Sequence, residues 1–240
     1  AVFRKEQVFF KSYGKFFRQM LHLFRHLFVQ DRPSLDLLHS AGIMHCSISG
    51  DTRFDRVAAI AGKALEVPFI NLFAATKRVI VAGSTWEGDE ELLAAYVNDN
   101  PGTKLIIAPH EITPAHIGKL QDLFPQHLLY SHLHGEKESG QTALQKAQVL
   151  IIDSVGLLSR LYAYATITFV GGGFTKDGIH NILEGAVWGK PVIFGPNYRK
   201  YREAKELLAA GGAKSVTTAD EFKRLADGLL RKEDHLQQDN

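Results

Sequence analysis

From residue 78 onward, short runs of apolar and β-branched residues recur at regular intervals along the chain. They lie at residues 79–81, 105–107, 128–130, 149–152, 167–170 and 192–194. Strands that are apolar on both faces are typical of a parallel sheet covered by helices on its two sides. Amphipathic stretches at 90–97, 179–188, 201–210 and 219–230 supply those helices, with Thr217 and Thr218 as N-caps of the last. This pattern predicts a doubly wound α/β domain of Rossmann type.

The first 77 residues follow a different pattern. We expect a long helix over residues 6–27, an apolar piece at 28–29, a helix at 34–39, a strand at 43–48 and a helix after Asp51. Two strands and three helices are too few to build an open sheet covered on both faces. We therefore expect residues 1–77 to be the back part of a second, incomplete Rossmann-like domain, with a linker at 67–77. Residues 78–240 form the complete domain.

Composition excludes several classes of protein. The 28 Lys and Arg residues against 26 Asp and Glu residues give a net charge of +2, which is too small to argue for nucleic acid as a partner. The single Cys46 rules out an intrachain disulfide and suits a reducing compartment. No apolar run approaches the ~18 residues that a membrane-spanning helix needs.

The N-terminal segment is both basic and aromatic. Residues 4–32 carry seven Lys or Arg residues against two acidic ones, a net charge of +5, and residues 3–28 include eight aromatic residues. Such a segment can lie on an anionic membrane surface. The alternative, which we favour from the sequence, is a helix that packs its Phe stripe on its own domain.

The most informative stretch is a glycine-rich turn after the strand at 167–170. Gly171, Gly172 and Gly173 end the strand, and a loop leads to a helix expected to begin near His180. Glycines let backbone N–H groups approach a ligand, and a helix N-terminus adds about half a positive charge. These properties suit a nucleotide phosphate, with Lys176 adding charge. The spacing matches neither a P-loop nor a dinucleotide fingerprint, and a turn that serves packing only remains an alternative.

Asn181 and Glu184 follow on one face of the same predicted helix. A carboxylate there can accept both hydroxyls of a ribose, while the Asn181 amide can donate to phosphate or sugar. The alternative is a capping interaction within the first helical turn.

Other candidates follow further strands and should share the carboxyl edge of the sheet, where α/β proteins bind ligands. Small hydroxyl residues after the first strand suit a phosphate or an acidic sugar, or act as a helix N-cap. The turn after the strand at 149–152 offers backbone N–H groups to a base or a phosphate. These candidates are Ser84, Thr85, Pro109, His110, Asp153, Val155 and Gly156.

Metal and nucleophile sites find little support. His110, His127, His132 and His134 lack the further ligand spacing of a zinc site, so surface histidines are favoured and no metal is predicted. No G-x-S-x-G motif occurs, and Cys46 lacks the context of an activated thiol.

Together these strand-end motifs resemble the 3-deoxy-D-manno-octulosonic acid (Kdo) transferases of lipopolysaccharide synthesis. The block from Gly171 to Pro196 is long and ordered, and it is the most specific match. The resemblance runs through nearly all of the sequence but covers only the second part of the family's chain. The matching pieces are residues 50–55, 83–85 with 90–91, 109–110, 153–156 and 171–196.

The resemblance implies a GT-B architecture, in which two Rossmann-like domains face a cleft. It also implies inverting transfer of Kdo from CMP-Kdo to a lipid A precursor, without a metal or cofactor, at the cytoplasmic face of the inner membrane. By resemblance, Pro109, His110 and the turn at 153–156 hold the cytosine. Gly172, Gly173 and Asn181 hold the phosphate, and Glu184 holds the ribose. Ser84, Thr85 and His180 complete the expected nucleotide-sugar-binding set.

The sequence departs from the family in three respects. The Arg that often precedes the His of the family's P-R-H segment is absent at Pro109-His110, and Leu157 replaces a common acidic residue. The family's general base, a glutamate, lies near the start of its N-terminal domain, so we expect no catalytic residue here. This chain is then a fragment that binds CMP-Kdo but lacks the base. Alternatives are a GT-B transferase or epimerase that uses a UDP-sugar, and a non-catalytic module that binds a sugar nucleotide or a membrane partner.

Overall fold

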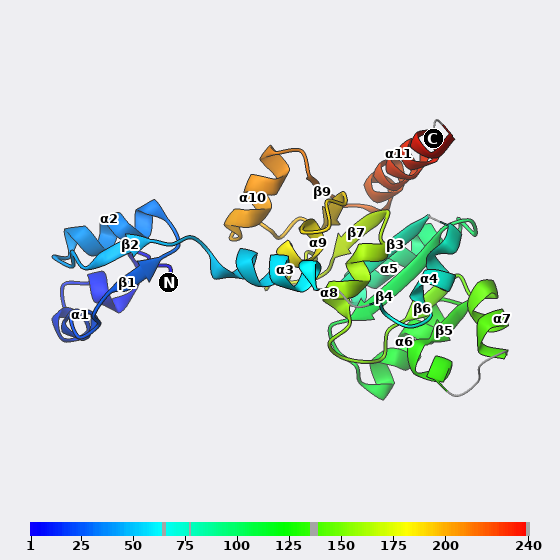
Figure 1. Ribbon diagram of the computed structural model, residues 1–240, viewed down its shortest axis with the longest axis horizontal. Helices are drawn as coiled ribbons and strands as arrows, with labels where there is room; N and C mark the ends of the chain where they lie inside the picture. The colour runs from blue at the N-terminus through cyan, green and yellow to red at the C-terminus, as the bar shows by residue number, and fades with distance from the viewer. Residues whose placement is uncertain (64–65, 77, 135–138, 239–240) are drawn as a thin grey trace. The chain divides into compact units, whose positions relative to one another are not determined.

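The computed structural model of the protein describes residues 1–63, 66–76, 78–134 and 139–238. The chain divides into two compact units, Ala1–Arg56 and Val57–Asn240, each of which is described by itself (Figure 1). The boundary between the units lies 21 residues before the boundary expected from the sequence at 77/78. The assignment of the two parts to acceptor and donor stays a prediction.

The first unit is a small α/β structure. Strands β1 (Leu27–Val29) and β2 (Cys46–Ile48) pair in parallel. Helix α2 (Arg32–Ser40) begins at Asp31, whose carboxylate accepts the Ser34 N–H at 2.8 Å as an N-cap. The core of this unit consists of Phe3, Leu21, Val29, Leu35, Leu38 and Ile43.

The prediction of one long helix over residues 6–27 is wrong. The segment forms a 3-10 turn, η1 (Val8–Phe10), and a separate helix, α1 (Lys15–Leu21). Gly14 lies between them, and a β-carbon there would come within 1.8 Å of the Val8 carbonyl oxygen. This close approach of two backbone segments breaks the helical path. The aromatic periodicity therefore does not mark one helix face.

The second unit contains a seven-stranded sheet in which all pairs are parallel, in the order β5-β6-β4-β3-β7-β8-β9. The strands are β3 (Val79–Thr85), β4 (Lys104–Pro109), β5 (His127–Leu129), β6 (Val149–Ile151), β7 (Ile167–Val170), β8 (Val192–Phe194) and β9 (Ala213–Ser215). The six apolar runs of the sequence correspond to the first six of these strands. The seventh strand, Ala213–Ser215, contains Lys214 and Ser215 and so has no apolar run that the sequence pattern could mark.

Helices cover both faces of this sheet (Figure 1). Ile80 of β3 faces a core formed with α5 (Glu87–Val97), α6 (Pro114–Leu123) and α11 (Ala219–Gln238). Val79 and Val81 of the same strand face the opposite core. The elements on that side are α4 (Ile70–Phe73), α7 (Ser139–Lys146), α8 (Leu158–Leu161), η3 (Tyr130–His134) and η4 (Tyr162–Tyr164). This alternation confirms the doubly wound α/β fold class.

The remaining helices are α3 (Thr52–Gly62), α9 (Leu183–Ala186) and α10 (Arg202–Ala209), with η2 (Ala74–Thr76). The sequence predicted a linker at 67–77, but residues 67–76 belong to the second unit, because Val67, Ile70 and Phe73 are buried in its core. Phe69 has a left-handed backbone (φ 67°) at the start of α4, and this four-residue helix is too short to show a helical period in the sequence. Lys77 lies outside the described residues. Thr218 caps α11 as predicted, accepting the Glu221 N–H at 3.2 Å.

The strand order reverses between β3 and β7. From β3 the chain passes to the neighbouring β4, then to β5 at the edge of the sheet and back to β6 between β5 and β4. It then places β7 on the other side of β3. In open α/β sheets, ligands bind outside the carboxyl ends of the two strands at such a switch point. The carboxyl ends of β3 and β7 therefore locate the candidate site.

Candidate functional site

The end of β3 differs from its prediction. The strand continues through Ser84 and Thr85, and its register with β4 shifts at Ser84, whose backbone is left-handed (φ 53°). Thr85 is fully buried, and its hydroxyl donates to Glu90 Oε1 at 2.9 Å. The N-cap position of α5 is held by Trp86, so the N-cap alternative for Ser84 and Thr85 is wrong. Thr85 secures α5 to the sheet, and its hydroxyl is already engaged.

Three aromatic rings from three strand ends meet at the switch point. Trp86 follows β3, His110 follows β4, and His180 lies in the loop after β7. The His110 ring stacks on Trp86 at a centroid distance of 4.7 Å and on His180 at 4.5 Å. Trp86 Nε1 donates to His180 Nε2 at 3.1 Å. We call these three residues the ring cluster. The His110 side chain is exposed, which leaves an aromatic surface for a flat ligand.

The hydrogen bond from Trp86 fixes the protonation state of His180. An indole N–H can only donate, so the partner Nε2 must be an unprotonated acceptor and the ring must carry its proton on Nδ1. Burial lowers the pKa of His180, and the nearby His110 lowers it further against the opposing effect of Asp177. The ring cluster therefore holds a neutral imidazole whose Nδ1–H can donate to a ligand. Trp86 was absent from the candidates, although its place directly after a strand end could have indicated it.

The glycine-rich turn is tied to α5 by a buried carboxylate. Asp89 Oδ2 accepts the Gly172 N–H at 2.8 Å and the Trp86 N–H at 3.0 Å. The Gly172 N–H is thus not free for the phosphate, contrary to its expected role. The Gly173 N–H forms no hydrogen bond with the described residues and remains a possible donor. Asp89 was not a candidate, because its partner Gly172 lies 83 residues away.

Asp89 is an unusual carboxyl group. It is fully buried, and its second oxygen, Oδ1, has no hydrogen-bond partner among the described residues. Burial raises the pKa of Asp89 to about 6, against the lowering effect of the Gly172 and Trp86 N–H groups. The adjacent Glu90 raises it slightly further. Asp89 thus joins the ends of β3 and β7 from inside the protein.

The glycines also allow two loops to pack backbone against backbone. A β-carbon at Gly173 would lie 2.4 Å from Gly195 N, and one at Gly171 would lie 2.3 Å from the Ser84 carbonyl oxygen. The packing alternative for this turn is therefore what the structure shows at Gly171 and Gly173. Packing and ligand binding are compatible at Gly173. Gly195 occupies the place that a β-carbon would take, but the Gly173 N–H has no hydrogen-bond partner among the described residues.

The helix expected to begin near His180 is shorter than predicted. Helix α9 spans only Leu183–Ala186, so the expected helix start at residues 180–181 is wrong, and the phosphate role of Asn181 stays a prediction. Asn181 Nδ2 donates to Glu184 Oε1 at 2.9 Å, which is the local interaction that was the alternative to ribose binding. Glu184 Oε2 accepts no hydrogen bond from the described residues. A ribose contact through that oxygen stays a prediction.

The other candidates lie outside the ring cluster. Both carboxylate oxygens of Asp153 accept hydrogen bonds from Ser131, so this side chain anchors η3. Val155 is 85% exposed, and Gly156 has the positive φ (84°) of a tight turn. Pro109 is buried as the last residue of β4, opposite Thr85. Among the described residues, no hydrogen bond or ring contact joins the 153–156 turn to the ring cluster, and its cytosine role stays a prediction.

Two further results concern metals and membranes. Across residues 1–63, 66–76, 78–134 and 139–238, no cluster of three or more His, Cys, Asp or Glu side chains is arranged to hold a metal ion. Within the same ranges, no helix is both long enough and apolar enough to cross a bilayer. The side chain of His134 lies outside those described.

The comparisons with known proteins agree with the sequence resemblance. No family model matches the chain. It is 25% identical over 217 residues to the 3-deoxy-D-manno-octulosonic acid transferase of Rickettsia typhi, covering 90% of this chain and 46% of the relative. It is 34% identical over 140 residues to the enzyme of that name from Aquifex aeolicus, covering 56% of this chain and 36% of the relative. The chain thus spans about half the length, or less, of these curated relatives.

A solved structure shares the fold. It is the C-terminal CMP-Kdo binding domain of WaaA from Acinetobacter baumannii, with a TM-score of 0.57 and 21% sequence identity. The match covers 78% of this chain and 94% of that domain. At this identity the likeness concerns the fold, and it confirms the predicted type of α/β domain.

Proposed function

We propose that this chain, which is homologous to Kdo transferases over most of its length, is the donor-binding part of such an enzyme. The intact enzyme would transfer Kdo from CMP-Kdo to a lipid A precursor during lipopolysaccharide synthesis. The observation that carries the proposal is the convergence of the ring cluster and the Asp89-bound glycine turn at the β3/β7 switch point. A nucleotide-binding domain of this class needs its ligand groups at that place.

Each part of the site has a role in this proposal. The exposed ring of His110 offers a flat surface to the cytosine, and the neutral His180 offers its Nδ1–H. The Gly173 N–H would contact the phosphate of CMP. A fixed backbone donor at this phosphate would stabilise the departing CMP as the glycosidic bond breaks. We assign no proton-abstracting base to a residue of this chain.

Calorimetry with nucleoside monophosphates tests the proposal. CMP should bind more tightly than UMP or AMP, because the bases differ while the phosphate is the same. A preference for UMP would instead favour a transferase or epimerase that uses a UDP-sugar. Absence of binding by all three nucleotides, in protein shown to be folded, would overturn the proposal.

Glu184→Ala is expected to weaken CMP binding by about 1–3 kcal/mol if the Glu184 carboxylate accepts ribose hydroxyl groups. Glu184→Gln retains an oxygen that can accept from Asn181, and so separates the loss of that local contact from the loss of the charge. Glu91→Ala, an exposed position on α5, is the control. Titration calorimetry with CMP measures all three variants. Unchanged affinity in Glu184→Ala would reject the ribose role.

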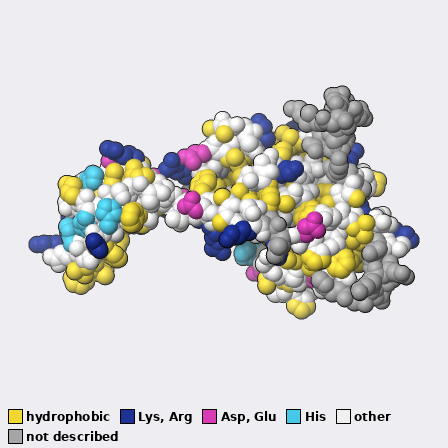
Figure 2. Space-filling view, in the orientation of Figure 1, with side chains coloured by type: hydrophobic (Ala, Val, Ile, Leu, Met, Phe, Trp, Pro, Cys, Tyr) yellow, Lys and Arg dark blue, Asp and Glu magenta, His cyan; other side chains and the backbone are white. Residues whose placement is uncertain are grey.

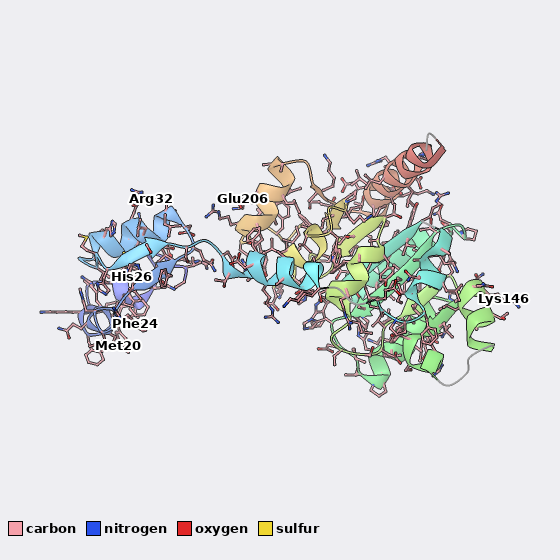
Figure 3. All side chains as sticks on the ribbon, viewed as in Figure 1. Met20, Phe24, His26, Arg32, Lys146 and Glu206 are labelled. Atoms are coloured by element: carbon pink, nitrogen blue, oxygen red, sulfur yellow. The ribbon has the colours of Figure 1, made fainter. Side chains whose placement is uncertain are left out.

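The first unit supports a second part of the proposal, contact with the inner-membrane surface. Phe16, Met20, Leu23 and Phe24 are 69%, 47%, 84% and 55% exposed. They lie within the basic 4–32 segment, and Figure 3 shows Met20 and Phe24 at the surface of this unit. Hydrophobic, His, Lys and Arg side chains mingle on the face of the unit shown in Figure 2. The interpretation that the Phe stripe packs on its own domain holds only for Phe3, Phe9 and Phe10, which contact one another.

Apolar side chains beside basic ones match an anionic bilayer. The protein should therefore co-sediment with vesicles that contain phosphatidylglycerol, and much less with vesicles of phosphatidylcholine alone. The double variant Phe16→Ser/Phe24→Ser should reduce the bound fraction at least tenfold, since burial of each ring contributes roughly 1 kcal/mol or more. Equal binding of the variant and the unaltered protein would contradict this part of the proposal.

A further inference from the structure

A positively charged cavity lies beside the glycine-rich turn in the second unit. Its volume is about 580 Å³, and it is lined by Lys176, Pro196, Asn197, Arg199 and Lys200. Lys176 comes from the loop after β7, and the other four residues come from the loop after β8. Two adjacent strand ends therefore contribute to one concave surface.

Hydrogen bonds hold these two loops together. Asn197 N donates to the Gly173 carbonyl at 2.9 Å, and Asn197 Nδ2 donates to the Thr175 carbonyl at 3.0 Å. The Asn197 carbonyl in turn accepts the Ile179 N–H at 3.2 Å, and the Tyr201 hydroxyl donates to the Asp177 carbonyl at 2.9 Å. The backbone that carries the three cations is thus fixed by contacts on both sides of Lys176.

The three cations are not neutralised by partners. Lys176, Arg199 and Lys200 are exposed, and none of them forms an ion pair with a described residue. Lys200 Nζ lies 5.3 Å from the centre of the Tyr201 ring. Asp177 follows Lys176 in the sequence, but with Arg199 and Lys200 the net charge of the two loops is still positive. Three cations around one concavity attract an oxyanion, and the guanidinium group of Arg199 matches the geometry of a carboxylate or phosphate.

The cavity borders the nucleotide side of the proposed site. A β-carbon at Gly172 would lie 2.6 Å from the Gly178 carbonyl oxygen and 2.9 Å from His180 Cδ2. A β-carbon at Gly178 would lie 2.3 Å from the Asn197 carbonyl oxygen and 3.3 Å from Lys200 Cε. The loop at 172–180 therefore contacts the ring cluster through Gly172 and the cavity wall through Gly178.

We propose that Lys176, Arg199 and Lys200 form a subsite for an oxyanion carried by a sugar substrate, distinct from the phosphate of CMP. The identity of the substrate rests on the proposed function. Two sources supply the same chemistry: the carboxylate of the donor sugar and a phosphate of the acceptor. The carboxylate of the donor is bonded close to the CMP phosphate, and it would be delivered to the cavity whenever the nucleotide occupies the ring cluster.

Calorimetry on charge-neutral variants tests the subsite. The unaltered protein should bind CMP-Kdo more tightly than CMP. In Arg199→Gln/Lys200→Gln, and separately in Lys176→Gln, this difference should shrink at least fivefold while CMP affinity stays within twofold. Lys205→Gln, an exposed position on α10 outside the cavity, is the matched control and should behave as the unaltered protein.

A second arm uses glucosamine 1-phosphate, which carries a sugar phosphate and no carboxylate. Binding that the cavity variants abolish would support the subsite with the acceptor as its source. The proposal is overturned if the variants change neither the affinity for CMP-Kdo nor that for glucosamine 1-phosphate. It is also overturned if they weaken the binding of CMP as much as that of CMP-Kdo, since the cations would then contact the nucleotide phosphate. If CMP fails to bind the unaltered protein, the proposed function fails, and the arm with glucosamine 1-phosphate still tests the cavity.

Discussion

Gly173→Ala is expected to lower the free energy of unfolding by about 3 kcal/mol or more and to remove CMP binding. The added β-carbon would lie 2.4 Å from Gly195 N and 2.5 Å from Gly195 Cα. Both are backbone atoms, so no side-chain rotation can relieve the overlap. The loops after β7 and β8 would have to separate, and the hydrogen bond from Asn197 N to the Gly173 carbonyl would be lost with them.

Urea unfolding and CMP titration of the same variant measure both effects. Gly118→Ala in α6 is the matched control, because a β-carbon there meets nothing within 4 Å and alanine favours a helix. The control should be unchanged or more stable by up to about 1 kcal/mol. If Gly173→Ala unfolds at the same urea concentration as the control, the two loops do not pack as described.

Asp89→Ala is expected to destabilise the second unit by about 2–4 kcal/mol, because two buried N–H groups lose their acceptor. These groups belong to Trp86 and Gly172, so the ends of β3 and β7 lose their direct connection. CMP binding should fall in parallel, since the ring cluster and the glycine turn are no longer held together. Glu91→Ala, two positions along the same helix but exposed, should change the unfolding free energy very little.

The raised pKa of Asp89 makes a separate prediction about pH. Its folded-state value of about 6 exceeds the ordinary value of 3.8, so the folded protein binds the proton more tightly than the unfolded chain. The contribution of Asp89 to stability therefore falls as pH rises from about 4 to about 6, by roughly 3 kcal/mol in total, and is constant above that range. The unpartnered Oδ1 can take the proton while Oδ2 keeps both N–H groups.

Other carboxyl groups act in the opposite direction, so the measurement is the difference between the unaltered protein and Asp89→Asn. The unfolding free energy of the unaltered protein should decline relative to that of Asp89→Asn between pH 4 and pH 6. Curves that stay parallel over this interval would show that Asp89 does not titrate there.

The sequence predicted the sheet and the edge where the site lies, because both follow from local patterns. The apolar runs marked six of the seven strands, and Gly171–Gly173 marked the turn after β7. His110 and His180 were identified from their places after strands, and the structure brings their rings within 4.5 Å of each other. The carboxyl ends of the strands in a parallel sheet lie along one edge, so this edge can be predicted as the place of the site without knowledge of individual contacts.

The predictions that failed depend on particular contacts that the pattern of residue types does not show. In the sequence, Asp89 is an ordinary acidic residue in the first turn of α5, and only the fold brings its carboxylate to the Gly172 N–H. In the sequence, Trp86 is only an aromatic residue before a helix. The fold brings His110, after β4, and His180, in the loop after β7, into contact with it. The helix expected over 6–27 has a regular aromatic pattern, but the close approach of Gly14 to Val8 interrupts it. Periodicity alone carries no information about such approaches.

The central claim is that the nucleotide binds at the ring cluster between β3 and β7. The chain contains two tryptophans, and their indole N–H groups bond to different partners: Trp86 to His180, and Trp188 to the Ser159 carbonyl at 2.9 Å. Two-dimensional ¹H–¹⁵N spectra therefore report the site and an internal reference together, with Trp188→Phe assigning the signals. CMP should shift the Trp86 indole signal saturably and leave that of Trp188 unchanged. CMP binding that shifts neither signal would contradict the account.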